Sequence, residues 1–356
     1  MLSLPALRAW IAAHAYPTYR VTQVLAWIYR RRVTDFAAMS NLPHALRAAL
    51  AEHFVIPHLT PALVTASSDG TRKLLFQLDA GAAIESVLIP DPPRLTLCIS
   101  SQAGCAMGCA FCATARLGLV RNLSAEEIAG QVLAAQEQLE SGERISNIVF
   151  MGMGEPLANY DAVVQAVEIL TAEWGLGFSP RRIAVSTVGL VPAMQRLVRD
   201  TAVNLAVSLS TTTEAQRALL LPISRRHSLQ ALLAMCRALP IPQRRRISFE
   251  YVMLAGVNDS LEDAGRLVRL LHGIRSKVNL IPFNPFPGAG FTCPSEAAIR
   301  RFQERLLAAG VHATVRQSRG RDIRAACGQL ALAGGAPAPR NRVGDPERQP
   351  RGAAAI

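Results

Sequence analysis

The segment LTLCISSQAGCAMGCAFC, residues 95–112, joins a strand-like run to three cysteines on a CxxxCxxC spacing. Thiolates so close along the chain can converge on one soft metal centre. Three cysteines leave a four-iron cubane one ligand short, and a small molecule can bind at the open iron. The spacing of Cys105, Cys109 and Cys112 therefore predicts a catalytic [4Fe-4S] cluster directly after a strand.

Zinc is the main alternative for such a loop. Structural zinc sites also use CxxC pairs, but they usually recruit a second pair or histidines to complete a tetrahedron. No histidine occurs between His58 and His227, so none shares the loop. We therefore favour iron over zinc.

Strand-like runs alternate with helical stretches from residue 95 onwards. This pattern is typical of repeated βα units and a parallel sheet. Six strands are too few for an eight-stranded barrel, so we predict an α/β fold with an open, partial (β/α)6 barrel whose strand ends carry the chemistry. The runs are LTLCIS, NIVFM, RRIAVS, NLAVSLS, ISFEYVML and VNLIPF, which begin at residues 95, 147, 181, 204, 247 and 278.

The rest of the chain predicts three further parts. Apolar residues recur at helical spacing as far as Phe54, which predicts a small helical domain over residues 1–55. Short β-rich runs predict a connector over residues 56–94, ahead of the barrel and a catalytic C-terminal segment over residues 95–330. Residues 331–356 are rich in Ala, Gly, Pro and Arg without apolar periodicity, so we expect a disordered tail.

Composition narrows the class of protein. The formal net charge is +12 and the pI about 10.1, which favours a polyanionic partner, since Lys and Arg neutralise phosphates. Arginines cluster at residues 30–32, 181–182, 225–226 and 244–246, so we expect RNA or DNA binding.

No run reaches the roughly 18 apolar residues of a membrane span, and no basic leader precedes the apolar start. Four of the seven cysteines lie between Cys98 and Cys112, which favours a reducing, cytoplasmic location.

The second barrel strand is followed by GMGEP, residues 152–156. Glycines there let the backbone approach a ligand, and Glu155 supplies a carboxylate for a cation or an amine. A dinucleotide-binding fingerprint is disfavoured because the third glycine of GxGxxG is absent. An ordinary strand-to-helix turn explains GMGEP equally well.

CxxxCxxC after the first strand and GMGEP after the second together resemble the radical S-adenosylmethionine (SAM) enzymes. Five segments also resemble, in order, the family of adenine methyltransferases that includes RlmN and Cfr. These segments are CISSQAGCAMGCAFC, NIVFMGMGEPLANYD, EYVML, NLIPFNPFPG and RGRDIRAACGQL. The resemblance implies a [4Fe-4S] cluster and SAM as cofactors, an electron donor such as flavodoxin, and methylation of adenine C2 in 23S rRNA, with tRNA as a second candidate substrate.

The resemblance also assigns roles to residues. Cys105, Cys109 and Cys112 correspond to the cluster ligands, Cys98 and Cys327 to paired catalytic cysteines, and Glu85 to a general base. The positions that correspond to SAM contacts are Gly154, Glu155, Ser186, Ser208, Leu209, Ser210 and Asn284. Two positions depart from the family pattern: Ser210 stands where histidine is common, and Val188 where a small hydroxyl residue is common.

A mechanism follows from the resemblance and from the substrate. The C2 and C8 carbons of adenine have no lone pair to attack a sulfonium methyl group, so we expect a radical route. One SAM would methylate Cys327, and a second would yield the radical that removes hydrogen from that methyl group before it adds to the base. Glu85 or Cys98 would then take a proton, and Cys98 would attack sulfur to release the product and form a disulfide with Cys327. Methylation at C8, and a non-catalytic RNA-binding module with a structural metal, are the alternatives.

Overall fold

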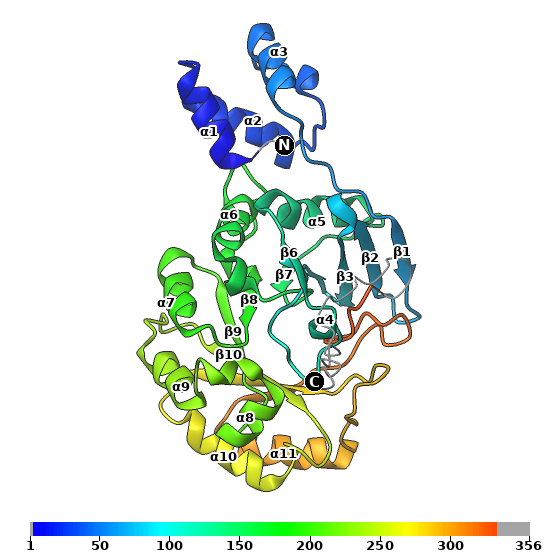
Figure 1. Ribbon diagram of the computed structural model, residues 1–356, viewed down its shortest axis with the longest axis vertical. Coiled ribbons are helices and arrows are strands. Elements are labelled where there is room, and N and C mark those ends of the chain that lie inside the picture. Colours follow the sequence, from blue (N-terminus) through cyan, green and yellow to red (C-terminus); the bar gives the residue numbers. More distant parts are fainter. Residues whose placement is uncertain (1–2, 333–356) are drawn as a thin grey trace, which may run out of the picture.

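A ten-stranded sheet runs through the computed structural model, which describes residues 3–332. Figure 1 shows the sheet curving through the lower part of the molecule, with helices packed outside it and three N-terminal helices standing above. The strand order is β1-β2-β3-β4-β7-β8-β9-β10-β11-β12. The five pairs from β4 to β11, and the pair β11–β12, are all parallel.

The parallel part forms the partial barrel that the sequence predicts, and the α/β fold class is confirmed. Its strands are β4 (Arg94–Cys98), β7 (Asn147–Phe150), β8 (Ile183–Thr187), β9 (Asn204–Ser208), β10 (Ile247–Met253), β11 (Ser276–Pro282) and β12 (Ala313–Val315). All six predicted runs are present. The prediction missed β12, because three residues are too few to show an alternating pattern.

Helices cross over between these strands. They are α4 (Ala113–Arg116), α5 (Ala125–Glu137), α6 (Tyr160–Thr171), α7 (Val191–Asp200), α8 (Glu214–Leu220), α9 (Leu229–Ala238), α10 (Leu261–Leu271) and α11 (Glu296–Ala308). The start of α5 shows how the sequence sets such boundaries. Ser124 accepts a hydrogen bond from the backbone N–H of Glu127, whose carboxylate accepts one from the N–H of Ser124. This capping box satisfies two backbone donors at the helix start.

The connector continues the barrel sheet as antiparallel strands. β1 (Leu63–Ala66), β2 (Arg72–Gln77) and β3 (Ala83–Asp91) form a meander, and β3 pairs with β4. A separate hairpin of β5 (Gln102–Gly104) and β6 (Leu119–Asn122) flanks the cysteine loop. The connector therefore lies directly beside the first strand of the barrel.

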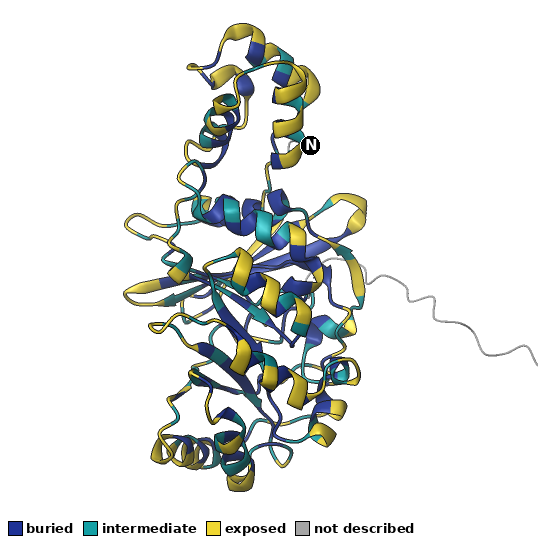
Figure 2. Ribbon diagram, turned by 90° about the vertical axis from the view of Figure 1, so that its left-hand side faces the viewer, coloured by how far each residue is buried: buried dark blue, intermediate teal, exposed yellow. Residues whose placement is uncertain are grey.

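The N-terminal part consists of α1 (Leu4–Ala13), α2 (Tyr19–Tyr29) and α3 (His44–His53). Leu7, Leu25 and Leu50, which carry the predicted helical periodicity, are buried. Figure 2 shows buried residues on the inner sides of these helices and throughout the barrel sheet, with exposed residues on the outer faces. The division of the chain into four domains stays a proposal.

Two further expectations from the sequence concern membrane-spanning segments and the C-terminal tail. Between residues 3 and 332, none of the helices has both the length and the apolar character for crossing a bilayer. The expected disordered tail lies outside the described residues from residue 333 onwards.

Candidate active site

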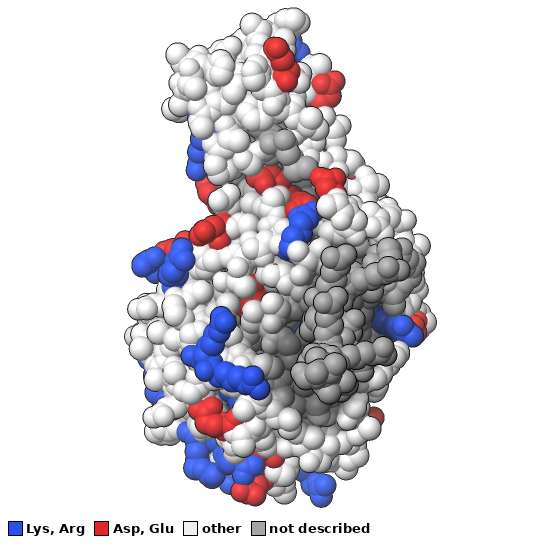
Figure 3. All heavy atoms as spheres, viewed as in Figure 1, with Lys and Arg blue, Asp and Glu red and all other residues white. Residues whose placement is uncertain are grey.

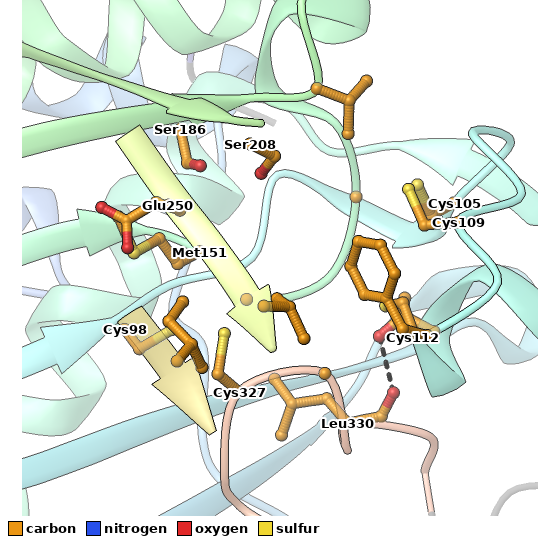
Figure 4. Close-up of a pocket in the computed structure, with 18 of the residues that line it drawn as sticks. Cys98, Cys105, Cys109, Cys112, Met151, Ser186, Ser208, Glu250, Cys327 and Leu330 are labelled. Atoms are coloured by element: carbon orange, nitrogen blue, oxygen red, sulfur yellow. Dashed lines mark hydrogen bonds between the residues drawn. The ribbon is translucent and has the colours of Figure 1, made fainter. Parts of the chain in front are cut away.

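A cavity opens where the carboxyl ends of the barrel strands meet, as expected for a parallel barrel. Figure 4 shows Cys105 and Cys109 on one side of it and Cys98 and Cys327 on the other. Most of the predicted site residues line it: Cys98, Cys105, Cys109, Cys112, Gly154, Glu155, Ser186, Ser208, Asn284 and Cys327. Three predicted residues do not belong to this lining, namely Glu85, Leu209 and Ser210.

The cysteine loop is held by its flanking hairpin. The backbone N–H of Cys105 donates to the carbonyl of Gly118 at 2.8 Å. Gly104 has φ +75°, and a Cβ there would lie 1.8 Å from that same carbonyl oxygen, so only glycine fits. On the far side of the loop, the N–H of Ala110 donates to the carbonyl of Leu220. These contacts fix the loop at the cavity wall.

The three thiols of the loop are the donor set that an iron–sulfur cluster takes. Burial and, to a smaller extent, the neighbouring thiols raise the pKa of Cys105 to about 12 and that of Cys109 well above its ordinary value. A metal centre supplies the positive charge that deprotonates such thiols. Within residues 3–332, no three His, Cys, Asp or Glu side chains are grouped so that they could hold one metal ion. In a cubane each cysteine binds a different iron, so its ligands stand further apart.

The glycines of GMGEP are required by the packing of β7 against the chain that follows β4. A Cβ on Gly152 would lie 2.7 Å from the carbonyl oxygen of Ile99, and one on Gly154, at φ +99°, would lie 2.6 Å from Cβ of Gln102. Their close approach is thus to the protein's own backbone and side chains, although both glycines also line the cavity. The sequence alone predicts an approach of this backbone to a ligand.

Glu155 is buried beside these glycines. Its carboxylate oxygens accept hydrogen bonds from the backbone N–H groups of Leu157 at 3.0 Å and Val188 at 2.9 Å. Burial raises the pKa of Glu155 to about 7, although these hydrogen bonds oppose the shift. The carboxylate is thus oriented by the backbone at the cavity wall, and its contact with SAM stays a prediction.

Ser186 and Ser208 lie at or next to the ends of β8 and β9 and line the cavity. Ser210 lies farther along and is fully buried, and its hydroxyl accepts a hydrogen bond from the N–H of Val252 at 3.1 Å. Its backbone has φ +48°, in the left-handed region. The hydroxyl thus holds the backbone of β10, and a contact of Leu209 or Ser210 with SAM stays a prediction.

Cys98 and Cys327 come together from opposite ends of the barrel sequence. Cys98 ends β4, and Cys327 follows β12 on the last described segment. Figure 4 shows their side chains on the same side of the cavity. Burial and, to a smaller extent, the Cys327 thiol raise the pKa of Cys98 to about 12, and the Arg316 guanidinium opposes this shift. Both thiols therefore belong to the same cavity, to which Arg316 also contributes.

Long-range hydrogen bonds position Cys327. Asn284 donates from Nδ2 to the carbonyl of Cys327 at 3.2 Å. The N–H of Ala113 donates to the carbonyl of Gly328 at 2.7 Å, and the Thr114 hydroxyl donates to the carbonyl of Leu330 at 2.6 Å, a bond drawn in Figure 4. The helix that follows Cys112 is therefore tied directly to the segment that carries Cys327.

Glu85 holds that same segment from the connector side. Its Oε1 pairs with the Lys73 ammonium at 2.8 Å, and its Oε2 accepts hydrogen bonds from the N–H groups of Ala331 and Leu332 at 3.1 Å each. The carboxylate is 1% exposed, so these partners surround it. The structure places Glu85 as an anchor of the C-terminal segment, and its role as a general base stays a prediction.

Sequence reasoning missed three charged residues at or behind the cavity. Glu250 lines it from β10, and its Oε2 has no hydrogen-bond partner among the described residues. Arg316 lines it beside the Cys98 and Cys327 thiols. Arg217 is fully buried and donates to the carbonyls of Val188 and Leu209. Only Glu250 gave a signal, as a lone charge within an apolar strand, since Glu is rarely buried without a partner.

A partial barrel with three cysteines at the mouth of its first βα unit defines the radical SAM class of enzymes. A sequence profile of the Radical SAM superfamily matches residues 99–269, and a profile of the ribosomal RNA large subunit methyltransferase N-terminal domain matches residues 1–56. The chain belongs to the RlmN family of radical SAM methyltransferases, as its relatives show.

Two curated relatives and one crystal structure show the similarity in sequence and in structure. The Dual-specificity RNA methyltransferase RlmN of Desulfosudis oleivorans is 51% identical over 90% of this chain and 87% of its own length. That of Geobacter sulfurreducens is 52% identical over 92% of this chain and 90% of its own. The crystal structure of a radical SAM methyltransferase from Sphaerobacter thermophilus has a TM-score of 0.85 at 48% identity and covers 92% of this chain and 97% of that one.

Proposed function

We propose that this protein is a dual-specificity RNA methyltransferase that places a methyl group on C2 of adenine in 23S rRNA and in tRNA. The observation that supports this most directly is the presence of Cys98 and Cys327 in the cavity that also holds the three-cysteine loop. A radical SAM enzyme that only cleaved its cofactor would have no use for that second pair. Relatives that share about half of their residues with this chain are named as RNA methyltransferases.

The residues of the cavity have distinct tasks in this proposal. When bound, the cluster and SAM supply methyl groups and a 5′-deoxyadenosyl radical. Cys105, Cys109 and Cys112 hold the cluster, while Gly154, Glu155, Ser186, Ser208 and Asn284 orient SAM. Cys327 carries the methyl group to the base, and Cys98 attacks the sulfur of Cys327 to release the product, which leaves a disulfide for a reductant to reopen.

The partners follow from charge and chemistry. On the face drawn in Figure 3, basic side chains form several groups over the barrel and few over the upper part of the molecule. A chain with a net charge of +12 is suited to RNA. A low-potential donor such as reduced flavodoxin would supply the electron, and the cytoplasm is the compartment where RNA, this donor and reduced thiols coexist.

Nucleoside mass spectrometry tests the proposed function. Anaerobically reconstituted protein is incubated with SAM, a reductant and either a 23S rRNA fragment or tRNA. We expect 2-methyladenosine in both RNAs from the wild type and from Cys293→Ser, a matched control because Cys293 lies outside the cavity lining. A product methylated at C8 would reassign the carbon. An intact cluster that splits SAM without modifying either RNA would overturn the proposal.

A further inference from the structure

A second hollow lies at the other end of the barrel, where the parallel strands begin. Asn147 starts β7, Asn204 starts β9, and both line it. Three separate pieces of chain contribute basic side chains: the turn before β8, the loop before β10, and the start of β11. The basic lining residues are Arg181, Arg182, Arg244, Arg245, Arg246 and Lys277, and no acidic residue lines the hollow.

The chain segments that bring these arginines together are fixed by hydrogen bonds. The side chain of Asn204 donates to the carbonyl of Arg181 at 2.8 Å and to that of Ile183 at 3.2 Å. The Arg245 guanidinium donates to the carbonyls of Ala202 and Val203 and so holds the loop before β10. The Arg245 side chain thus stabilises the loop before β10, while the other five basic side chains line the hollow without such a role among the described residues.

Among the residues that the structure describes, no carboxylate neutralises the basic side chains of this hollow. None of the six cations forms an ion pair with a carboxylate of residues 3–332. Elsewhere the same chain does pair its arginines, as Arg121 with Glu127 at 2.7 Å and Arg266 with Asp263 at 2.6 Å. Like charges held together repel one another, so the arrangement favours binding of an anion.

Arginine identifies the kind of anion. Apart from Arg245, which holds the loop before β10, four of the five remaining cations are guanidinium groups, whose planar forks match phosphate oxygens two at a time. The side-chain amide of Asn147 adds hydrogen-bond donors that suit the same oxygens. Several phosphates at adjacent positions would satisfy such a cluster better than one small anion would.

We propose that this hollow binds the phosphodiester backbone of the substrate RNA at a point remote from the target adenine. This inference rests on the proposed function, because it concerns the same RNA. The seven residues of β10 separate the hollow from the cavity by roughly 20 Å, so only an RNA larger than a short stem-loop reaches both. An acidic electron-donor protein fits less well here, since it would stand one barrel length away from the cysteine loop.

The test compares a triple variant of the hollow with a control of equal charge change. Arg182→Glu/Arg244→Glu/Arg246→Glu alters the hollow, whereas Arg300→Glu/Arg301→Glu/Arg305→Glu alters exposed positions on α11. Methylation is measured on full-length tRNA and on a short stem-loop with the same adenine. For the hollow variant we expect KM for tRNA to rise about tenfold with kcat unchanged, and the slope of log affinity against log salt to fall by about 2, as lost phosphate contacts require.

The same variant should methylate the stem-loop as the wild type does, and the α11 variant should behave as the wild type on both RNAs. If the glutamates lower the melting temperature, Arg182→Gln/Arg244→Gln/Arg246→Gln should show the same pattern with a smaller rise in KM. Equal losses on tRNA and stem-loop, or equal effects of the hollow and α11 variants, would overturn the proposal. If the wild type methylates no RNA, tRNA binding by the two variants still tests the hollow, so the two failures are distinguishable.

Discussion

The cysteine loop over residues 105–112 and the C-terminal segment over residues 316–332 meet in one cavity but are built differently. The loop is held mainly from nearby in the chain, by the β5–β6 hairpin that surrounds it. The C-terminal segment is held by distant partners, among them Glu85, Asn284 and Thr114. The cluster ligands are thus a local feature of sequence, whereas the position of Cys327 is a property of the whole fold.

The largest expected effect is the loss of methylation, and the iron content of the variants distinguishes the cysteine loop from the C-terminal segment. Cys109→Ser and Cys327→Ala should both abolish methylation. Cys109→Ser should also lose most of its iron and sulfide, because a buried hydroxyl does not replace a thiolate ligand. Cys327→Ala should keep wild-type iron and still form 5′-deoxyadenosine when reduced, because the cluster loop does not depend on that thiol. Iron and sulfide analysis with nucleoside chromatography measures both.

Cys236→Ser supplies the control for this comparison. Cys236 is a buried thiol on α9 that does not line the cavity, so its replacement tests for nonspecific damage. It should retain both iron and methylation. Wild-type iron in Cys109→Ser, or methylation by Cys327→Ala, would remove the distinction between the two regions.

The same contrast explains what could be predicted from sequence. The six longer barrel strands and the CxxxCxxC loop are carried by short-range patterns, and both were found. The position of Glu85 depends on a pairing across 247 residues, between its carboxylate and the N–H of Leu332, and that of Ser210 on a pairing across 42 residues, between its hydroxyl and the N–H of Val252. Spacing does not encode these pairings, so a family role could be transferred to Glu85 without revealing that its oxygens already have partners. Arg316 follows β12, which is too short to be predicted.

An intermediate effect is expected at the ion pair that holds the C-terminal segment. Glu85→Gln leaves the buried Lys73 ammonium without its partner, which should lower the free energy of unfolding by about 3–5 kcal/mol. Glu85→Gln/Lys73→Met removes the unpaired charge and should recover most of that loss. Urea unfolding of the two variants measures the difference.

The activity of the double variant decides between an anchor and a base. If Glu85 anchors the segment, Glu85→Gln/Lys73→Met should methylate RNA within about tenfold of the wild type once both are folded. Loss of a general base costs about 10²- to 10⁴-fold, whatever the stability of the protein. A stable double variant with a loss of that size would establish Glu85 as the base and reject the anchor as its main role.

The smallest effect is expected at the outer edge of the C-terminal segment, where Asp322 is exposed. Its carboxylate accepts hydrogen bonds from the Ser67 hydroxyl at 2.6 Å and the N–H of Ser68 at 3.2 Å, and these bonds lower the pKa of Asp322. Asp322→Asn weakens both bonds without touching the cavity, so we expect faster hydrogen exchange confined to residues 316–332, a loss of methylation of about two- to threefold, and unchanged iron.

Asp161→Asn removes another exposed carboxylate, whose ion pair with Arg196 is 3.4 Å long. It should alter neither the exchange of residues 316–332 nor methylation. Faster exchange in Asp322→Asn with full activity would show that Cys327 is positioned by the inner contacts with Asn284 and Thr114 alone. Faster methylation without faster exchange would instead mean that the charge of Asp322 acts on RNA, because an exposed carboxylate repels phosphate and Asp322→Asn removes that repulsion.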